Sequence, residues 1–123
     1  ALEGNQEEYN LVLDAFLGRA AAIIEAAGVE LIIVYQPEQS LKSDGTLQYG
    51  YSENGMAEFE AACEKYGIVF CDMTTSFDKL YQQEHILAHG FSNSEVGEGH
   101  LNKYGHAVIA EVITEKIQEL EAE

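Results

Sequence analysis

The stretch Val-Glu-Leu-Ile-Ile-Val-Tyr, residues 29–35, decides the fold class of this protein. It is a short, nearly unbroken apolar run rich in β-branched residues, which is typical of a strand buried on both faces. The run stops at Gln36 and Pro37, because proline has no N–H group to donate to a ladder. A second such run covers residues 68–71 and ends at Asp72. We therefore expect two strands of a parallel sheet.

Helical periodicity surrounds both strand runs. Before the first run, apolar residues between positions 9 and 27 recur at spacings of three and four, and Gly28 follows where a left-handed cap is often needed. Between the runs the same spacing covers residues 56–66, with Ser52 or Asn54 as the candidate cap. Helices of this length can serve as crossovers between parallel strands. The order predicts an α/β fold.

The remaining segments fit the same interpretation. Residues 38–52 are polar and contain a turn signal, which predicts a loop or a small hairpin. Residues 75–83 predict a shorter helix, residues 89–99 an ordered loop, and residues from 103 almost to the end a final helix. Parallel sheets normally contain more strands than the two found here, and an open edge is an association hazard. We expect missing sequence or a partner chain to complete the sheet.

Composition excludes several classes of partner. The 123 residues suit one domain spanning 1–123, and 22 acidic against 6 basic side chains give a formal charge of −16. This charge repels phosphate backbones and anionic lipids, and no apolar run approaches the roughly 20 residues that span a bilayer. We expect no nucleic-acid or membrane partner, while the compartment stays open. Cys63 and Cys71 are too few for a disulfide framework, so we interpret them as buried apolar residues.

One histidine stands out in its local sequence. His100 ends a glycine-flanked loop and precedes Asn102, which is well placed to cap the last helix. An imidazole held there can be presented at the carboxyl end of the sheet, where open α/β folds usually bind ligands. It could take a proton from a serine hydroxyl. The structural alternative is a loop histidine that hydrogen-bonds to backbone.

Residues 99–110, Gly-His-Leu-Asn-Lys-Tyr-Gly-His-Ala-Val-Ile-Ala, resemble the last conserved block of SGNH/GDSL hydrolases. In that block a catalytic histidine is followed by Leu-Asn, then Gly-His, then an alanine-rich helix. The upstream order of helices and strands is also similar to the second half of the family. The resemblance implies a three-layer α/β/α flavodoxin-like fold with a parallel sheet, of which residues 1–123 are the C-terminal part. It implies an ester hydrolase, with His100 as general base and O-acylated carbohydrate as a candidate substrate.

The sequence departs from the family pattern at the position of the acid that orients the histidine. The family usually places an aspartate three residues before this histidine, where its carboxylate stabilises the imidazolium, but Gly97 occupies that position here. Glu98, Glu95 and Asp72 are the candidate substitutes. We select Glu98 as the second catalytic residue, because a residue two positions away on a glycine-rich loop can fold back. A Ser/His dyad with a backbone carbonyl orienting the ring of His100 is an equal alternative.

The nucleophile is a second departure. The Gly-Asp-Ser block and the blocks that supply oxyanion donors are absent from the sequence, and its serines lie in turns or loops without a strand-to-helix elbow. The sequence therefore predicts an esterase part whose serine lies outside this chain, so that the chain alone is inactive. Its expected partners are an ester substrate and the missing N-terminal half or a second copy of the chain. The alternative is a non-catalytic SGNH-like binding or assembly module.

The four histidines could in principle form a zinc site, since imidazole is a common zinc ligand. His85 and His89 would share one face if that stretch were helical, and His100 and His106 follow nearby. The surrounding residues look more like the close of a helix, and His106 falls on the last helix, where packing is the commoner role. We therefore expect no metal and no cofactor.

Overall fold

The chain forms two compact units in a computed structural model that describes residues 2–50, 56–94, 96–97 and 99–122. The first unit comprises the described residues of 1–33 and 51–70, and the second those of 34–50 and 71–123. The boundary between the units falls inside the first and last strands. The expectation of one domain stays a prediction.

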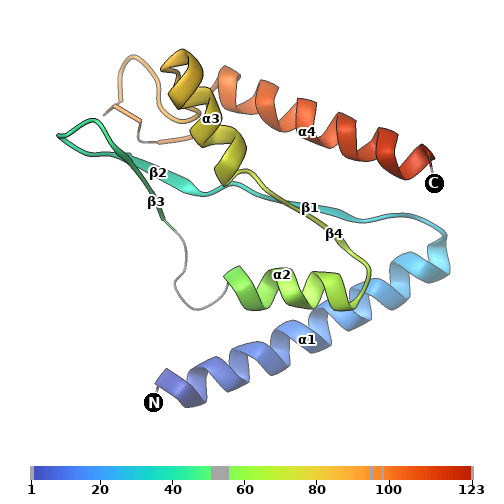
Figure 1. The fold of residues 1–123 in the computed structure, drawn as a ribbon. Helices are drawn as coiled ribbons and strands as arrows, with labels where there is room; N and C mark the ends of the chain where they lie inside the picture. The colour runs from blue at the N-terminus through green and yellow to red at the C-terminus, as the bar shows by residue number, and fades with distance from the viewer. Residues whose placement is uncertain (1, 51–55, 95, 98, 123) are drawn as a thin grey trace. The chain divides into compact units, whose positions relative to one another are not determined.

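The first unit is built on two helices that lie side by side, α1 (Leu2–Ala27) and α2 (Met56–Lys65) (Figure 1). A small core is formed by residues of both helices and of the segment after α2: Leu13, Leu17, Cys63 and Ile68. Gly28 follows α1 at φ 69°, and Gly67 follows α2 at the same angle, so both helices end in the left-handed conformation that glycine adopts without strain. Both predicted helices are confirmed. The candidate caps Ser52 and Asn54 lie outside the described residues.

The two predicted strands are β1 (Ile32–Tyr35) and β4 (Val69–Asp72), which pair in parallel. Next to this ladder, the Val69 amide donates to the Leu31 carbonyl at 3.2 Å, and the Met73 amide donates to the Tyr35 carbonyl at 2.9 Å. The mixed α/β class with a parallel pair of strands is thus confirmed.

The prediction of a first strand buried on both faces was wrong in detail. β1 begins at Ile32, so residues 29–31 lie outside it, and all four of its residues are half-buried. In the described part of the chain each of the two strands has one paired edge, and a two-stranded sheet covers its members less than a wide one does. An apolar run of this kind predicts a strand whose side chains suit deep burial. It does not predict how many neighbouring strands and helices cover that strand.

The second unit contains a hairpin and two helices (Figure 1). β2 (Glu38–Leu41) pairs antiparallel with β3 (Leu47–Gly50), which confirms the hairpin interpretation of residues 38–52 as far as they are described. α3 (Thr74–Glu84) packs against α4 (Lys103–Ala122). Both predicted helices are confirmed, and the described residues of 89–99 lie in the connection between them. The core of this unit is Met73, Phe77 and Ala88, with Val34, Tyr49, Leu101, Val108, Ile109 and Val112 packed around it.

Cys63 and Cys71 are free and buried, and burial raises the pKa of each thiol, which confirms their interpretation as buried apolar residues. None of the described helices is long and apolar enough to cross a membrane.

Candidate functional site

The segment that carries His100 is fixed to the loop after α3. Residues 88–90 run antiparallel to residues 100–102, joined by a bridge between His89 and Leu101. The Gly90 amide donates to the carbonyl of His100 at 2.9 Å, and the Asn102 amide donates to the carbonyl of Ala88, also at 2.9 Å. The backbone of His100 is therefore held in place by one hydrogen bond to its own carbonyl and by a second from the amide of Asn102.

Asn102 joins this segment to α4. Its Oδ1 accepts hydrogen bonds from the amides of Tyr104 at 3.0 Å and Gly105 at 3.1 Å, which confirms the predicted helix cap. Its Nδ2 donates to the carbonyls of Leu87 at 2.8 Å and Gly90 at 3.1 Å. One side chain thus caps the helix and holds the preceding loop. The hold on the loop could not be predicted from the neighbouring sequence, because the two carbonyl partners lie 12 and 15 residues earlier.

Gly105, in the first turn of α4, allows the helix to approach the loop closely at Ala88 and Leu101. A Cβ atom built there would lie 2.5 Å from the Ala88 carbonyl oxygen and 2.5 Å from a methyl group of Leu101. The first is a backbone atom that the bridge already holds, so a side chain at position 105 would separate α4 from the loop. The glycine of the Gly-His pair therefore has a packing role beside His100.

The imidazole of His100 is exposed to solvent. Two of its candidate acids, Glu98 and Glu95, lie outside the described residues. The carboxylate of Asp72 accepts hydrogen bonds from the amide of Thr74 at 3.0 Å and from its hydroxyl at 2.6 Å, at the start of α3. Among the residues that the structure describes, no acid is hydrogen-bonded or ion-paired to His100. The geometry gives an accessible imidazole on a fixed backbone, and the orienting acid stays a prediction.

The four histidines do not form a metal site in the described chain. His85 ends α3 in the left-handed conformation at φ 55°, so the helix face that His85 and His89 would share is not formed. His89 is buried in the bridge, whereas His100 and His106 are exposed. Within residues 2–50, 56–94, 96–97 and 99–122, no group of three His, Cys, Asp or Glu residues could hold a metal ion.

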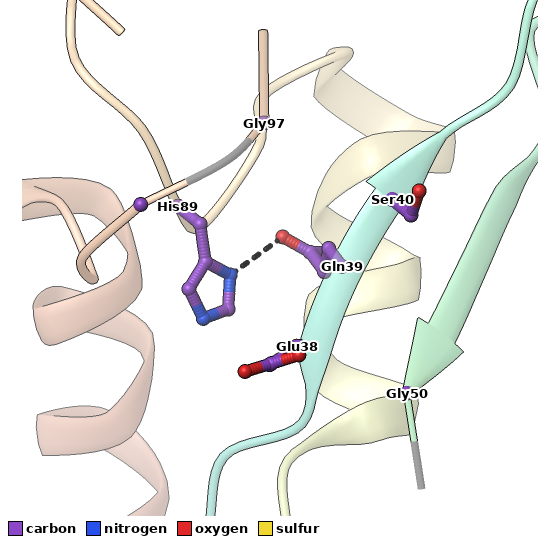
Figure 2. Close-up of a pocket in the computed structure, with 7 residues that line it drawn as sticks. Glu38, Gln39, Ser40, Gly50, His89 and Gly97 are labelled. Carbon is purple, nitrogen blue, oxygen red and sulfur yellow. Dashed lines mark hydrogen bonds between the residues drawn. The ribbon is translucent and has the colours of Figure 1, made fainter. Parts of the chain in front are cut away.

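His89 is the centre of a polar cluster that sequence reasoning missed. Its Nδ1 lies 2.9 Å from Oε1 of Gln39 on β2, and its ring packs edge-on against Phe77 with centroids 5.6 Å apart (Figure 2). Burial holds the pKa of His89 below its ordinary value. Both side chains line a cavity of about 390 Å³, which Ser40 also borders. The feature of the sequence that could have located this cluster is the position of Gln39 on the inward face of a strand. That position can be recognised only once the register of the hairpin is known.

No family model, curated protein or solved structure matches the chain. The assignment of His100 as a catalytic residue therefore depends on the local motif and on the geometry described above.

Proposed function

We propose that this chain is the His-bearing part of an SGNH/GDSL-type ester hydrolase, with His100 as general base and a serine nucleophile from sequence outside it. The proposed substrate is an O-acyl ester of a carbohydrate. The observation that carries the proposal is an exposed imidazole on a backbone segment that hydrogen bonds fix to its neighbour. A catalytic base has to reach a reacting hydroxyl in a reproducible place, and this arrangement supplies both access and position.

The chemistry assigned to His100 is transfer of one proton in each direction. The imidazole removes the proton of the serine hydroxyl as its oxygen attacks the acyl carbon. It then returns that proton to the leaving alcohol as the ester bond breaks. A water molecule repeats the sequence on the acyl-serine and releases the free acid. Glu98 is the proposed acid that orients the ring, with a backbone carbonyl as the alternative.

The proposed fold is the three-layer α/β/α arrangement of this family, in which β1 and β4 belong to a wider parallel sheet. Its support is the parallel pair itself and the helix that links the two strands along the chain. The missing N-terminal half of the domain, or a second copy of the chain, would complete the sheet. α1 supports contact with such a partner, although not the pairing of strands, because Val12, Phe16 and Ile23 form an exposed apolar stripe beside its buried face.

We expect the 123-residue chain alone to self-associate through that stripe. Light scattering after size exclusion should give a mass above the 13.6 kDa of one chain, and Phe16→Glu should return it to that value because a carboxylate there opposes apolar contact. Gln118→Glu, which adds the same charge at an exposed position of α4, should leave the association unchanged. A monomeric unmodified chain would contradict self-association.

The origin of the nucleophile can be tested by covalent labelling. A fluorophosphonate probe should label one serine of the natural full-length protein, because an activated serine hydroxyl attacks the phosphorus atom. The same probe should leave the 123-residue chain unlabelled. Mass spectrometry of the labelled peptide identifies the serine, and heat-denatured protein is the control for unspecific reaction. Strong labelling of the short chain at any of its serines would contradict an external nucleophile.

A further inference from the structure

The side of α1 that faces away from its core is apolar along most of the helix. Leu13 and Leu17 belong to the core that α1 shares with α2. The solvent side of a surface helix is usually polar, so an apolar solvent side indicates a partner that covers it. We call this side the outer face. Its apolar members follow a helical stripe and are all exposed: Val12, Ala15, Phe16, Ala22, Ile23 and Ala26.

Two charged residues lie on the outer face between positions 6 and 26 of α1. Glu8 lies four residues before Val12, and Arg19 lies between Phe16 and Ile23, three residues after the first and four before the second. The chain contains 22 acidic side chains, so a face with a single acid is depleted in its dominant charge. Few charged residues, with an arginine among them, are typical of the centre of a protein interface.

Arg19 has no acidic neighbour on its own helix. All four residues that lie three or four positions from it are apolar, and these are the positions that a side chain can reach along a helix surface. Glu8 has no basic neighbour at the same spacings. Neither side chain forms an ion pair with any residue that the structure describes. The outer face thus presents one cation and one anion to a partner, 11 positions apart in the sequence.

A second copy of α1 in the antiparallel direction matches both charges at once. If Glu8 of one copy faces Arg19 of the other, two-fold symmetry also sets Arg19 of the first copy against Glu8 of the second. In this register residues 2–25 of the two helices lie against each other, which is nearly the whole of α1. Near its centre Val12 faces Ala15 of the second copy, so that a branched side chain meets a small one.

The same two charges disfavour the other ways of pairing two copies. Parallel helices in register would set Glu8 against Glu8 and Arg19 against Arg19. An antiparallel register centred on Arg19 would also bring two guanidinium groups together. Like charges that meet in an interface oppose association. The outer face is therefore complementary to itself in the antiparallel register that joins Glu8 to Arg19.

We propose that α1 is the dimer interface of this protein, in which two outer faces pack antiparallel and two reciprocal Glu8–Arg19 ion pairs fix the register. The occupant of the outer face is one second copy of the chain. This inference rests on the self-association proposed above, to which it adds stoichiometry, direction and register. It is independent of the role of His100.

Charge reversal at the two positions tests the register. Glu8→Arg and Arg19→Glu should each weaken dimerisation about tenfold at low ionic strength, because two contacts between like charges replace two ion pairs. An equimolar mixture of these two variants should form heterodimers, since each copy supplies the charges that the other lacks. The double variant Glu8→Arg/Arg19→Glu should dimerise on its own, because both pairs return with reversed polarity. Sedimentation equilibrium measures each dissociation constant.

Glu7→Arg and Lys42→Glu are the matched controls. They make the same two changes of charge at exposed positions outside the outer face, and both should dimerise like the unmodified chain. Circular dichroism first establishes that every variant is folded. If one single variant does not fold, the other still decides the question against its own control.

The possible failures are distinguishable. An unmodified chain that is monomeric would overturn the proposal together with self-association, and would leave the outer face to the missing half of the domain. A dimer whose dissociation constant is the same in both single variants, a mixture that stays monomeric, or an assembly larger than a dimer would overturn the proposed interface alone. None of these results bears on the esterase, which is tested by labelling and turnover.

Discussion

Replacement of His100 by alanine should lower kcat/KM for p-nitrophenyl acetate in the natural full-length protein by about 10²- to 10⁴-fold, the usual contribution of a general base. The loss should appear mainly in kcat, since an imidazole that moves a proton in the transition state contributes little to binding of the ground state. The same variant should still fold. His100 is exposed, and substitution of an exposed side chain usually changes stability by about 0.5 kcal/mol or less.

The matched control is His106→Ala. His106 is also exposed and lies six residues later on α4, so it tests the loss of an imidazole near the site without the loss of the proposed base. Its activity should equal that of the unmodified protein. Equal rates for the His100 variant and the unmodified protein would exclude the assigned role. Retained folding with no activity in any form, including the unmodified full-length protein, would instead favour the non-catalytic module.

Labelling and turnover separate the two halves of the proposal. Fluorophosphonate reports whether an activated serine exists and where it lies, whereas the His100 variant reports whether this histidine activates it. A labelled serine together with an unaffected His100 variant would leave the esterase in place but assign the base to another residue.

The positions of the helices and strands could be predicted from the sequence more accurately than the burial of their residues. Apolar spacing located α1 and α2, because a helix repeats its buried face every three or four residues within one segment. The same local information placed β1 and β4. It could not predict that β1 is half-buried, because burial depends on how many strands and helices lie beside it. Local patterns thus determine the element, and distant neighbours determine its environment.

The candidate site divides in the same way. The cap made by Asn102 was predictable, because its amide partners follow within three residues. The cluster of Gln39 and His89 was not, since its members are 50 residues apart and neither type of residue usually marks a site alone. The spacing of His85 and His89 in the sequence suggests only a pair of zinc ligands on one helix face. The bridge between residues 88–90 and 100–102 places it instead in a buried position beside β2.

Replacement of Asn102 by alanine should be the most destabilising change of a polar residue near this site. It removes the cap of α4, which contributes about 1 kcal/mol, and it also removes the two hydrogen bonds from Nδ2, each of which contributes about 1 kcal/mol. We therefore expect the free energy of unfolding to fall by about 2 to 3 kcal/mol. Urea unfolding followed by circular dichroism measures this change. Asn93→Ala, at an exposed loop position, is the control and should unfold at the original midpoint.

Asn102→Asp separates the two roles of this side chain. Aspartate caps a helix about as well as asparagine does, but a carboxylate only accepts hydrogen bonds and would face the carbonyl oxygens of Leu87 and Gly90. The Asp variant should consequently be no more stable than the Ala variant. Recovery of the original midpoint by aspartate would show that only the cap matters. If the Nδ2 bonds do hold the loop, both variants should also lose esterase activity in the full-length protein, because the anchored backbone of His100 is what the proposed catalysis requires.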